Sequence, residues 1–160
     1  MVIEAINEIL KRKKLPILVG GSGLYAESVI NGYVFGEEKS NKAEPRYECL
    51  KIAIALDRDV LKARIAERTQ KWLREGLLKE VQGLLDAGIS PLWLDSCGQE
   101  YRHMSRYLQA QCSLDEAILK ANTEQLQFVK RQYTWWRRHA DLHWVLSSEE
   151  ALVLIKDFLT

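Results

Sequence analysis

Residues 130–138 combine more cations and indoles than any other stretch of the sequence, which reads Lys-Arg-Gln-Tyr-Thr-Trp-Trp-Arg-Arg there. If this stretch is helical, side chains three and four positions apart share a face, which groups Arg131, Thr134 and Arg138. A guanidinium pairs with phosphate oxygens and stacks on bases, so the composition indicates a surface for nucleic acid or polyphosphate. The alternative is an ordinary helix end, where the helix dipole favours cations whatever the function.

A glycine-rich turn is the second stretch with chemical potential. Residues 16–19 (Pro-Ile-Leu-Val) are typical of a buried parallel strand, and residues 20–23 (Gly-Gly-Ser-Gly) lead directly into a segment with helical character. Such a turn exposes backbone N–H groups at a helix N-terminus, where an anion is stabilised. A glycine-rich turn also occurs wherever a strand passes tightly into a helix, so a purely structural role is the alternative.

Composition limits the possible functions. The chain has 160 residues and a formal charge of only +1, so any contact with nucleic acid must come from local clusters of basic residues. Its three cysteines lack CxxC spacing and its three histidines complete no metal-ligand pattern, which indicates a reducing compartment and no structural metal. No apolar run approaches membrane-spanning length, so we expect a cytoplasmic protein without a membrane segment.

The periodicity predicts an α/β fold that is dominated by helices. Strands are expected at residues 16–19, 50–56 and 142–146, and long helical stretches between them imply a small parallel sheet. Residues 95–102 are interpreted as a polar loop that enters a short helix extending through Leu108. Ser113 and Glu116 form a capping box that starts a long helix ending in the basic stretch, with Phe128 and Trp136 on its buried side.

Four segments together resemble the tRNA dimethylallyltransferases in order and approximate spacing: residues 16–25, 64–81, 96–102 and 130–135. Each motif alone is weak, but four in register across nearly the whole chain are specific. The resemblance implies transfer of an isopentenyl group from dimethylallyl diphosphate to N6 of the adenosine next to the tRNA anticodon. It also implies a partial P-loop-kinase-like three-layer fold, with a small parallel sheet and a helix-rich C-terminal part.

The resemblance assigns roles on the diphosphate side of the site. Gly20, Gly21, Ser22 and Gly23 match the family's glycine turn, near the adenine and the diphosphate, with serine in place of the commoner threonine. Arg68, eight residues before a glycine, matches the catalytic arginine that neutralises the diphosphate leaving group. A cation fits that role, because an allylic carbon–oxygen bond breaks only as fast as the departing negative charge is stabilised.

The tRNA-contacting residues that the resemblance implies lie in two segments, the polar loop and the basic helix. The loop departs from the family, which more often has Gly-Tyr-Lys where this chain has Gly-Gln-Glu at residues 98–100. The complete expected set is Cys97, Gly98, Gln99, Glu100, Tyr101, Arg102, Lys130, Arg131, Gln132, Thr134, Trp135 and Arg137.

Two departures from the family pattern bear on activity. The family's G-x-x-x-x-G-K-S/T phosphate loop and its general-base aspartate have no counterpart in these residues, and no lysine follows the glycines at 20–23. Residues 33–48 are a shortened loop in place of the family's inserted helical lobe. We therefore expect residues 1–160 to form a single partial catalytic-type domain that is inactive alone, with an unpaired edge at residues 16–19.

Three functions remain open at this point. The first is a partial prenyl-transferring enzyme, with Mg²⁺ expected for the complete family enzyme and no cofactor assigned to this chain. The second is a non-catalytic remnant that binds tRNA, and the third is a relative that acts on free adenine nucleotides. The implied partners are tRNA, dimethylallyl diphosphate and, in the first case, a separate N-terminal half that carries the phosphate loop.

Overall fold

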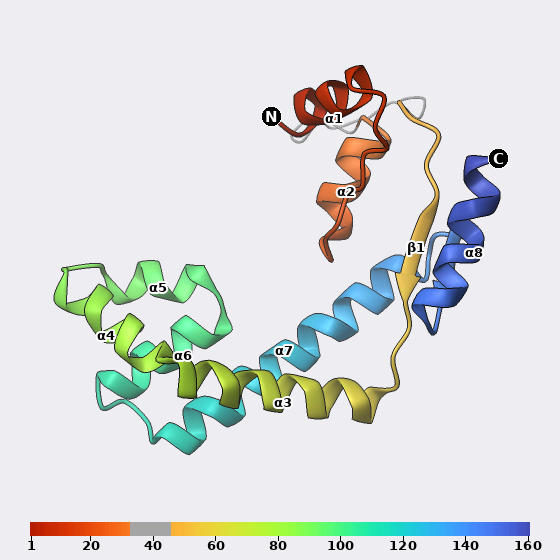
Figure 1. The fold of residues 1–160 in the computed structure, drawn as a ribbon. Helices are drawn as coiled ribbons and strands as arrows, with labels where there is room; N and C mark the ends of the chain where they lie inside the picture. Colours follow the sequence, from red (N-terminus) through yellow and green to blue (C-terminus); the bar gives the residue numbers. More distant parts are fainter. Residues whose placement is uncertain (33–45) are drawn as a thin grey trace. The chain divides into compact units, whose positions relative to one another are not determined.

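The computed structural model describes residues 1–32 and 46–160, which divide into two compact units. Unit 1 comprises residues 1–54 and 132–160, and unit 2 comprises residues 55–131. Within the described ranges the elements, drawn in Figure 1, are α1 Val2–Lys11, α2 Gly23–Ile30, β1 Lys51–Ile54, α3 Arg58–Glu75, α4 Leu77–Asp86, α5 Pro91–Cys97, α6 Gln99–Leu108, α7 Leu114–Trp136, β2 Leu142–Val145 and α8 Ser148–Leu159.

The sheet of unit 1 consists, among the described residues, of β1 and β2. The two strands are parallel, and their register pairs Lys51 with Leu142 and Ile54 with Val145. Helix α8 follows β2 and lies beside it (Figure 1), and Val145 is only 3% exposed. The prediction of strands near residues 50–56 and 142–146 in a small parallel sheet is therefore confirmed.

The predicted strand at residues 16–19 is wrong for the described part of the chain. This segment is neither helix nor strand, and no hydrogen bond joins its backbone to another described residue. Ile17 and Val19 are 77% and 87% exposed. An apolar run has the composition of a strand, but only a neighbouring strand satisfies its backbone donors and acceptors and makes it one.

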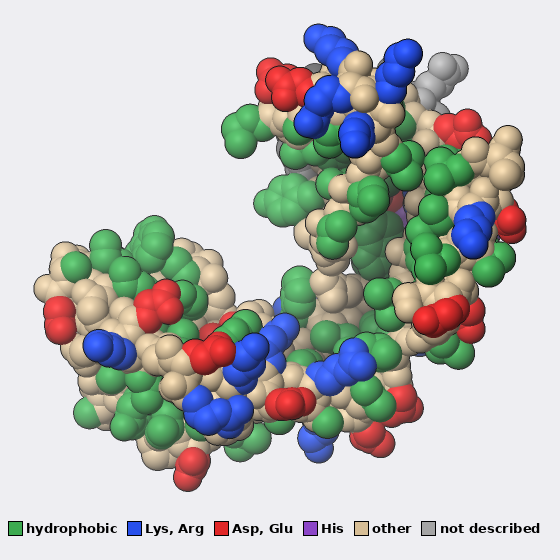
Figure 2. All heavy atoms as spheres, in the orientation of Figure 1, with side chains coloured by type: hydrophobic (Ala, Val, Ile, Leu, Met, Phe, Trp, Pro, Cys, Tyr) green, Lys and Arg blue, Asp and Glu red, His purple; other side chains and the backbone are tan. Residues whose placement is uncertain are grey.

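Apolar side chains remain exposed elsewhere in unit 1. Tyr25, Ile54 and Leu146 are each more than two thirds exposed, and α1 has no buried residue at all. In Figure 2, hydrophobic side chains lie open at the surface beside the Lys and Arg side chains around α1. Extensive apolar exposure of this kind is typical of a surface that another polypeptide segment covers.

Unit 2 has the better-formed core. Leu77 and Val81 of α4, Leu94 of α5, Met104 of α6 and Ala117 of α7 form one buried cluster. The helices that meet there have local stop and start signals, since the side chain of Asp57 caps α3 and Gly76, at φ +107°, separates α3 from α4. Contact between helices that are close in sequence explains the more complete burial of this unit.

The predicted polar loop at residues 95–102 is wrong, whereas the predicted short helix through Leu108 is confirmed by α6. Helix α5 runs to Cys97 and α6 begins at Gln99, so Gly98 alone separates them, at φ +147°. The start signal for α5 lies upstream, where the side chain of Ser90 accepts a hydrogen bond from the Trp93 backbone and proline occupies the first turn. A short seven-residue helix shows too few turns for its periodicity to be recognised in the sequence.

The capping box at the start of α7 is confirmed. The Ser113 hydroxyl accepts from the Glu116 backbone N–H at 3.2 Å, and the Ser113 backbone N–H donates to the Glu116 carboxylate at 2.9 Å. Hydrogen bonds from Ser113 hold the pKa of Glu116 below its usual range, because they stabilise the ionised carboxylate.

An ion pair between Lys51 and Asp141 joins the start of β1 to the residue before β2, with Nζ and Oδ2 2.5 Å apart. The hydrogen bond from Lys51 lowers the pKa of Asp141 in the folded state. The pair therefore stabilises the fold fully at pH values above the unfolded-state pKa of aspartate. This stabilisation is lost as the pH falls through the lower pKa of the folded state. Because the carboxylate is 61% exposed, we expect Lys51→Met to cost only about 0.5 kcal/mol at pH 7. Urea denaturation at pH 7 and near pH 2 checks this, and an equal loss at both values would contradict it.

Candidate functional site

Arg68 lies on α3 with its side chain 45% exposed. The centre of its guanidinium is 4.8 Å from the centroid of the Trp72 ring, and Nη2 is 3.9 Å from Oε1 of Glu100. A distance of 3.9 Å is too long for a hydrogen bond, and no described residue accepts one from this guanidinium. Arg68 is therefore held over an aromatic face with its donors available to an anion.

Arg68 is next to the residues that anchor α3 to α7. The hydroxyl of Thr69, which is 1% exposed, donates to the side-chain oxygen of Asn122 at 2.7 Å. This partly buried hydrogen bond fixes the helix turn that carries Arg68. Neither Thr69 nor Asn122 was predicted from the sequence, because an isolated polar pair 53 residues apart leaves no local pattern.

The structure brings Arg68 together with Glu100 of α6, a residue that was predicted separately. Glu100 is only 7% exposed, and its Oε1 accepts a hydrogen bond from Nε2 of Gln125 at 2.7 Å. The same amide donates to Oε1 of Gln99 at 3.1 Å. Gln125, on α7, was missed in the sequence. These contacts make Glu100 a buried anion at the edge of the Arg68 site.

Tyr101 and Arg102 make internal contacts in unit 2. The Tyr101 hydroxyl donates to Glu80 at 2.6 Å, and this hydrogen bond raises the pKa of Tyr101. Arg102 donates to Glu124 at 3.0 Å and to the backbone oxygen of Asp95 at 2.8 Å. Such contacts favour a structural role for both side chains.

Cys97 and Gly98, which were also predicted to contact tRNA, make fewer internal contacts than Tyr101 and Arg102. Cys97 is exposed, and its thiol lies 3.5 Å from the backbone oxygen of Trp93. Gly98 forms the break between α5 and α6 through its left-handed backbone. Of these two, only Cys97 presents a side chain to a partner.

Glu124 also contacts His103, which sequence reasoning missed. Nε2 of His103 is 3.0 Å from Oε1 of Glu124, while the imidazole is 1% exposed and Nδ1 has no partner among the described residues. One carboxylate on α7 thus joins an arginine and a histidine that are adjacent on α6. This shared contact orients α6, and with it Glu100.

The glycine turn lies in unit 1, against the last residues of α7. A Cβ at Gly21 would lie 1.8 Å from Nε2 of Gln132, and a Cβ at Gly23 would lie 2.1 Å from the Trp135 ring. Gly20 has open space around it. Ser22 is exposed and precedes α2 without capping it through its side chain. Close packing against the Trp135 ring therefore requires glycine at position 23, as the structural interpretation of the turn predicts, whereas at position 21 the flexible end of Gln132 could move aside.

Trp135 packs inward rather than lying open. Its Nε1 is buried and has no hydrogen-bond partner among the described residues, and Trp136 is partly buried beside His139 at 5.5 Å between ring centroids. Lys130, Arg131, Thr134 and Arg137 are exposed. The basic helix therefore separates into exposed residues and a packed pair, Gln132 and Trp135.

Two contacts around this helix end differ from expectation. Phe128, which was predicted to be buried, is 39% exposed and lies under the guanidinium of Arg131 at 5.8 Å. His139, just after α7, pairs with Glu27 of α2 at 2.9 Å, a contact that sequence reasoning missed. An exposed aromatic residue beside a cation is compatible with either a solvated helix or a nucleic-acid surface.

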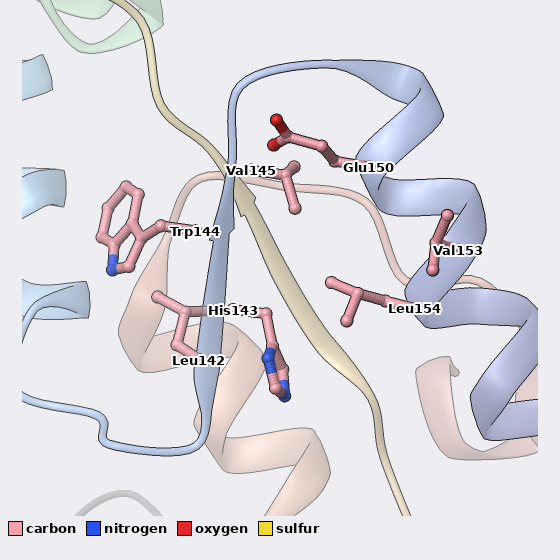
Figure 3. A pocket seen from close by; sticks show the side chains of 7 residues that line it. All are labelled: Leu142, His143, Trp144, Val145, Glu150, Val153 and Leu154. Carbon is pink, nitrogen blue, oxygen red and sulfur yellow. The ribbon is translucent and has the colours of Figure 1, made fainter.

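A shallow pocket in unit 1 lies between β2 and α8 (Figure 3). In that view Trp144 points away from α8, whereas Val153 and Leu154 of α8 face the strand. None of the predicted site residues lines this pocket. We therefore do not assign it to the candidate site.

The part of the chain that the structure describes contains no group of three His, Cys, Asp or Glu side chains that could hold a metal ion. Within the same residues, no helix has the length and apolar composition needed to cross a membrane.

Comparison with known proteins gives consistent matches. The family model described as IPP transferase matches residues 1–44 and 34–139. The tRNA dimethylallyltransferase 2 of Shewanella sediminis is 31% identical over 204 residues, covering 91% of this chain and 68% of that relative. The tRNA dimethylallyltransferase of Geobacter metallireducens is 41% identical over 112 residues, covering 68% of this chain and 35% of the relative.

The fold is similar to that of solved proteins. The tRNA isopentenylpyrophosphate transferase of Bacillus halodurans has a TM-score of 0.81 at 24% identity, covering 98% of this chain and 69% of that chain. A corresponding transferase of Staphylococcus epidermidis has a TM-score of 0.79 at 22% identity and similar coverage. The chain therefore spans about two thirds of the length of these proteins. Because the family model matches most residues of this chain, the chain belongs to the IPP transferase family, and the relatives that it resembles are tRNA dimethylallyltransferases.

Proposed function

We propose that this chain is part of a cytoplasmic tRNA dimethylallyltransferase, in which it binds the diphosphate leaving group and the tRNA, and that it is not active alone. The observation that carries the proposal is Arg68. Its guanidinium is half exposed, fixed over Trp72 and without a hydrogen-bond acceptor among the described residues. This is the state expected of a cation that receives a phosphate group from outside the protein.

In the proposed reaction, N6 of adenosine attacks the allylic carbon of dimethylallyl diphosphate. The carbon–oxygen bond breaks, the diphosphate leaves with the electron pair, and N6 loses a proton to a base. Arg68 stabilises the negative charge that develops on the leaving oxygen. From the family resemblance, the turn at residues 20–23 is proposed to lie near the diphosphate and the adenine.

Two features of the comparisons support the idea of a partial enzyme. The alignment with the Shewanella relative extends over 204 residues, more than the 160 of this chain, so the relative carries residues without a counterpart here. The family model matches in two stretches that overlap over residues 34–44. We infer that the shortened loop at 33–48 replaces an inserted lobe, although residues 33–45 lie outside the described residues.

The exposed apolar surface of unit 1 supports a partner. We propose that a separate polypeptide with a phosphate loop and a general base pairs with residues 16–19 and completes a larger parallel sheet of the P-loop-kinase type. The unpaired backbone and the exposure of Ile17 and Val19 favour this arrangement.

A non-catalytic tRNA-binding protein is the second candidate, favoured by the exposed cations of α7. No contact among the described residues favours the third possibility, a relative that acts on free adenine nucleotides. Cys97, Lys130, Arg131, Thr134 and Arg137 remain the proposed tRNA contacts, because they are exposed.

Binding of tRNA at several salt concentrations tests the RNA contact. If Lys130 and Arg131 each neutralise a phosphate, the double change Lys130→Ala with Arg131→Ala should reduce the slope of log K against log salt by roughly 1.5 to 2. Filter binding or fluorescence anisotropy with unmodified tRNA measures this slope.

A matched control removes two other exposed cations, through Lys11→Ala with Lys13→Ala at the end of α1. This variant loses the same net charge and should keep the parent slope. Equal slopes for the parent and the α7 variant, with the parent binding tRNA, would remove the RNA role from α7.

A further inference from the structure

Glu100 is a buried carboxylate that faces the cation of the proposed diphosphate site. Its side chain is 10% exposed, against 45% for Arg68, and the two charged groups are 3.9 Å apart. Gln125 donates to the same carboxylate oxygen that is nearest to Arg68, at 2.7 Å. The Glu100 carboxylate is therefore held by Gln125 on the protein side, while the exposed side of the Arg68 guanidinium is open to a ligand.

We propose that Glu100 is a specificity-determining residue that weakens the binding of the most highly charged anions at Arg68. It would act most strongly on free inorganic pyrophosphate, the leaving product, and less on its allylic monoester. This inference rests on the proposed function, which places the diphosphate at Arg68.

The physical reason is repulsion at short range. A phosphate group on the exposed side of Arg68 lies about one guanidinium width beyond a carboxylate that burial prevents from being screened by water. Inorganic pyrophosphate has one more ionisable oxygen than its monoester, so it carries more charge near neutral pH and is repelled more. Glu100 thus lowers the affinity for the product more than the affinity for the substrate.

A different role for Glu100 makes the opposite prediction. If the carboxylate served only to hold the long Arg68 side chain in place, its neutralisation would release that side chain and weaken both ligands. The sign of the change in affinity therefore separates repulsion from tethering.

The experiment is calorimetric titration of the purified chain with inorganic pyrophosphate and, separately, with dimethylallyl diphosphate. Glu100→Gln keeps an oxygen to accept from Gln125 and removes the charge. We expect it to bind pyrophosphate about fivefold more tightly than the parent, with a smaller gain for the monoester. Glu100→Ala is the second neutral variant, with the same expected direction, and thermal melting shows which of the two is folded.

Two further variants make the outcomes distinct. Asp86→Asn removes an exposed charge in the last turn of α4 and should leave both affinities unchanged. Arg68→Ala should weaken pyrophosphate binding at least tenfold. If Arg68→Ala binds as the parent does, or the parent does not bind, the diphosphate site itself is wrong. If Arg68→Ala loses binding while the folded neutral variants of Glu100 bind pyrophosphate no more tightly than the parent, only the role of Glu100 is wrong.

Discussion

Incubated with dimethylallyl diphosphate and an unmodified tRNA, the 160-residue chain is expected to transfer isopentenyl groups at least about 10²-fold more slowly than a full-length relative. An oriented general base typically contributes a factor of about 10² to 10⁴, and the sequence offers no aspartate in the family's position. No lysine follows the glycines at 20–23, so Arg68 is the cation proposed to stabilise the leaving group.

A radiolabelled transfer assay measures this rate directly. The tRNA dimethylallyltransferase 2 of Shewanella sediminis is a suitable positive control, because it is similar over most of this chain and longer than it. Turnover comparable to that of the control would show that these residues suffice for catalysis. Activity that appears only when a polypeptide with a phosphate loop is added would support the proposed partner.

The second large effect concerns the packing between the glycine turn and Trp135. Gly23→Ala places a methyl group 2.1 Å from the partly buried indole ring of Trp135, which cannot move aside as a flexible chain end would. We expect this change to lower the free energy of unfolding by about 2 kcal/mol through overpacking. Trp135→Ala removes the ring instead and should cost about 3 kcal/mol or more. Thermal or urea denaturation followed by tryptophan fluorescence and circular dichroism measures both changes.

Gly83→Ala provides the matched control, since a Cβ there meets nothing within 4 Å and the residue is inside α4. It should be neutral or stabilise the chain by up to about 1 kcal/mol. The competing interpretation makes Trp135 a platform for a tRNA base. In that case Trp135→Ala would leave stability unchanged and weaken tRNA binding by about 1 to 3 kcal/mol.

The sequence predicted those elements whose signals are local. Asp57 and the pair of Ser113 and Glu116 mark helix starts through side chains within three residues of the groups they cap. The strands near residues 51 and 142 were recognised from composition, and their parallel pairing followed from the helices between them.

What the sequence could not predict depends on partners distant in the chain. Residues 16–19 have a strand composition, but whether a strand forms depends on a neighbour that local patterns do not reveal. The contacts of Glu100 with Arg68 and Gln125 likewise join three helices. The sequence analysis placed Glu100 in a polar loop and, through the family resemblance, among the tRNA contacts, because burial of a glutamate is unusual. The site roles themselves remain predictions that the proposed binding experiments test.

The pairing of β1 with β2 has a consequence for the order of folding. Lys51 and Asp141, which bond at the start of the sheet, are 90 positions apart, whereas unit 2 is one continuous segment between the two strands. During synthesis, the helices of unit 2 emerge together and have their core residues available early. Strand β1 must stay unpaired until residues 142–145 leave the ribosome. The apolar segment at 16–19 is exposed throughout this delay, which makes the nascent N-terminal part a candidate for chaperone binding.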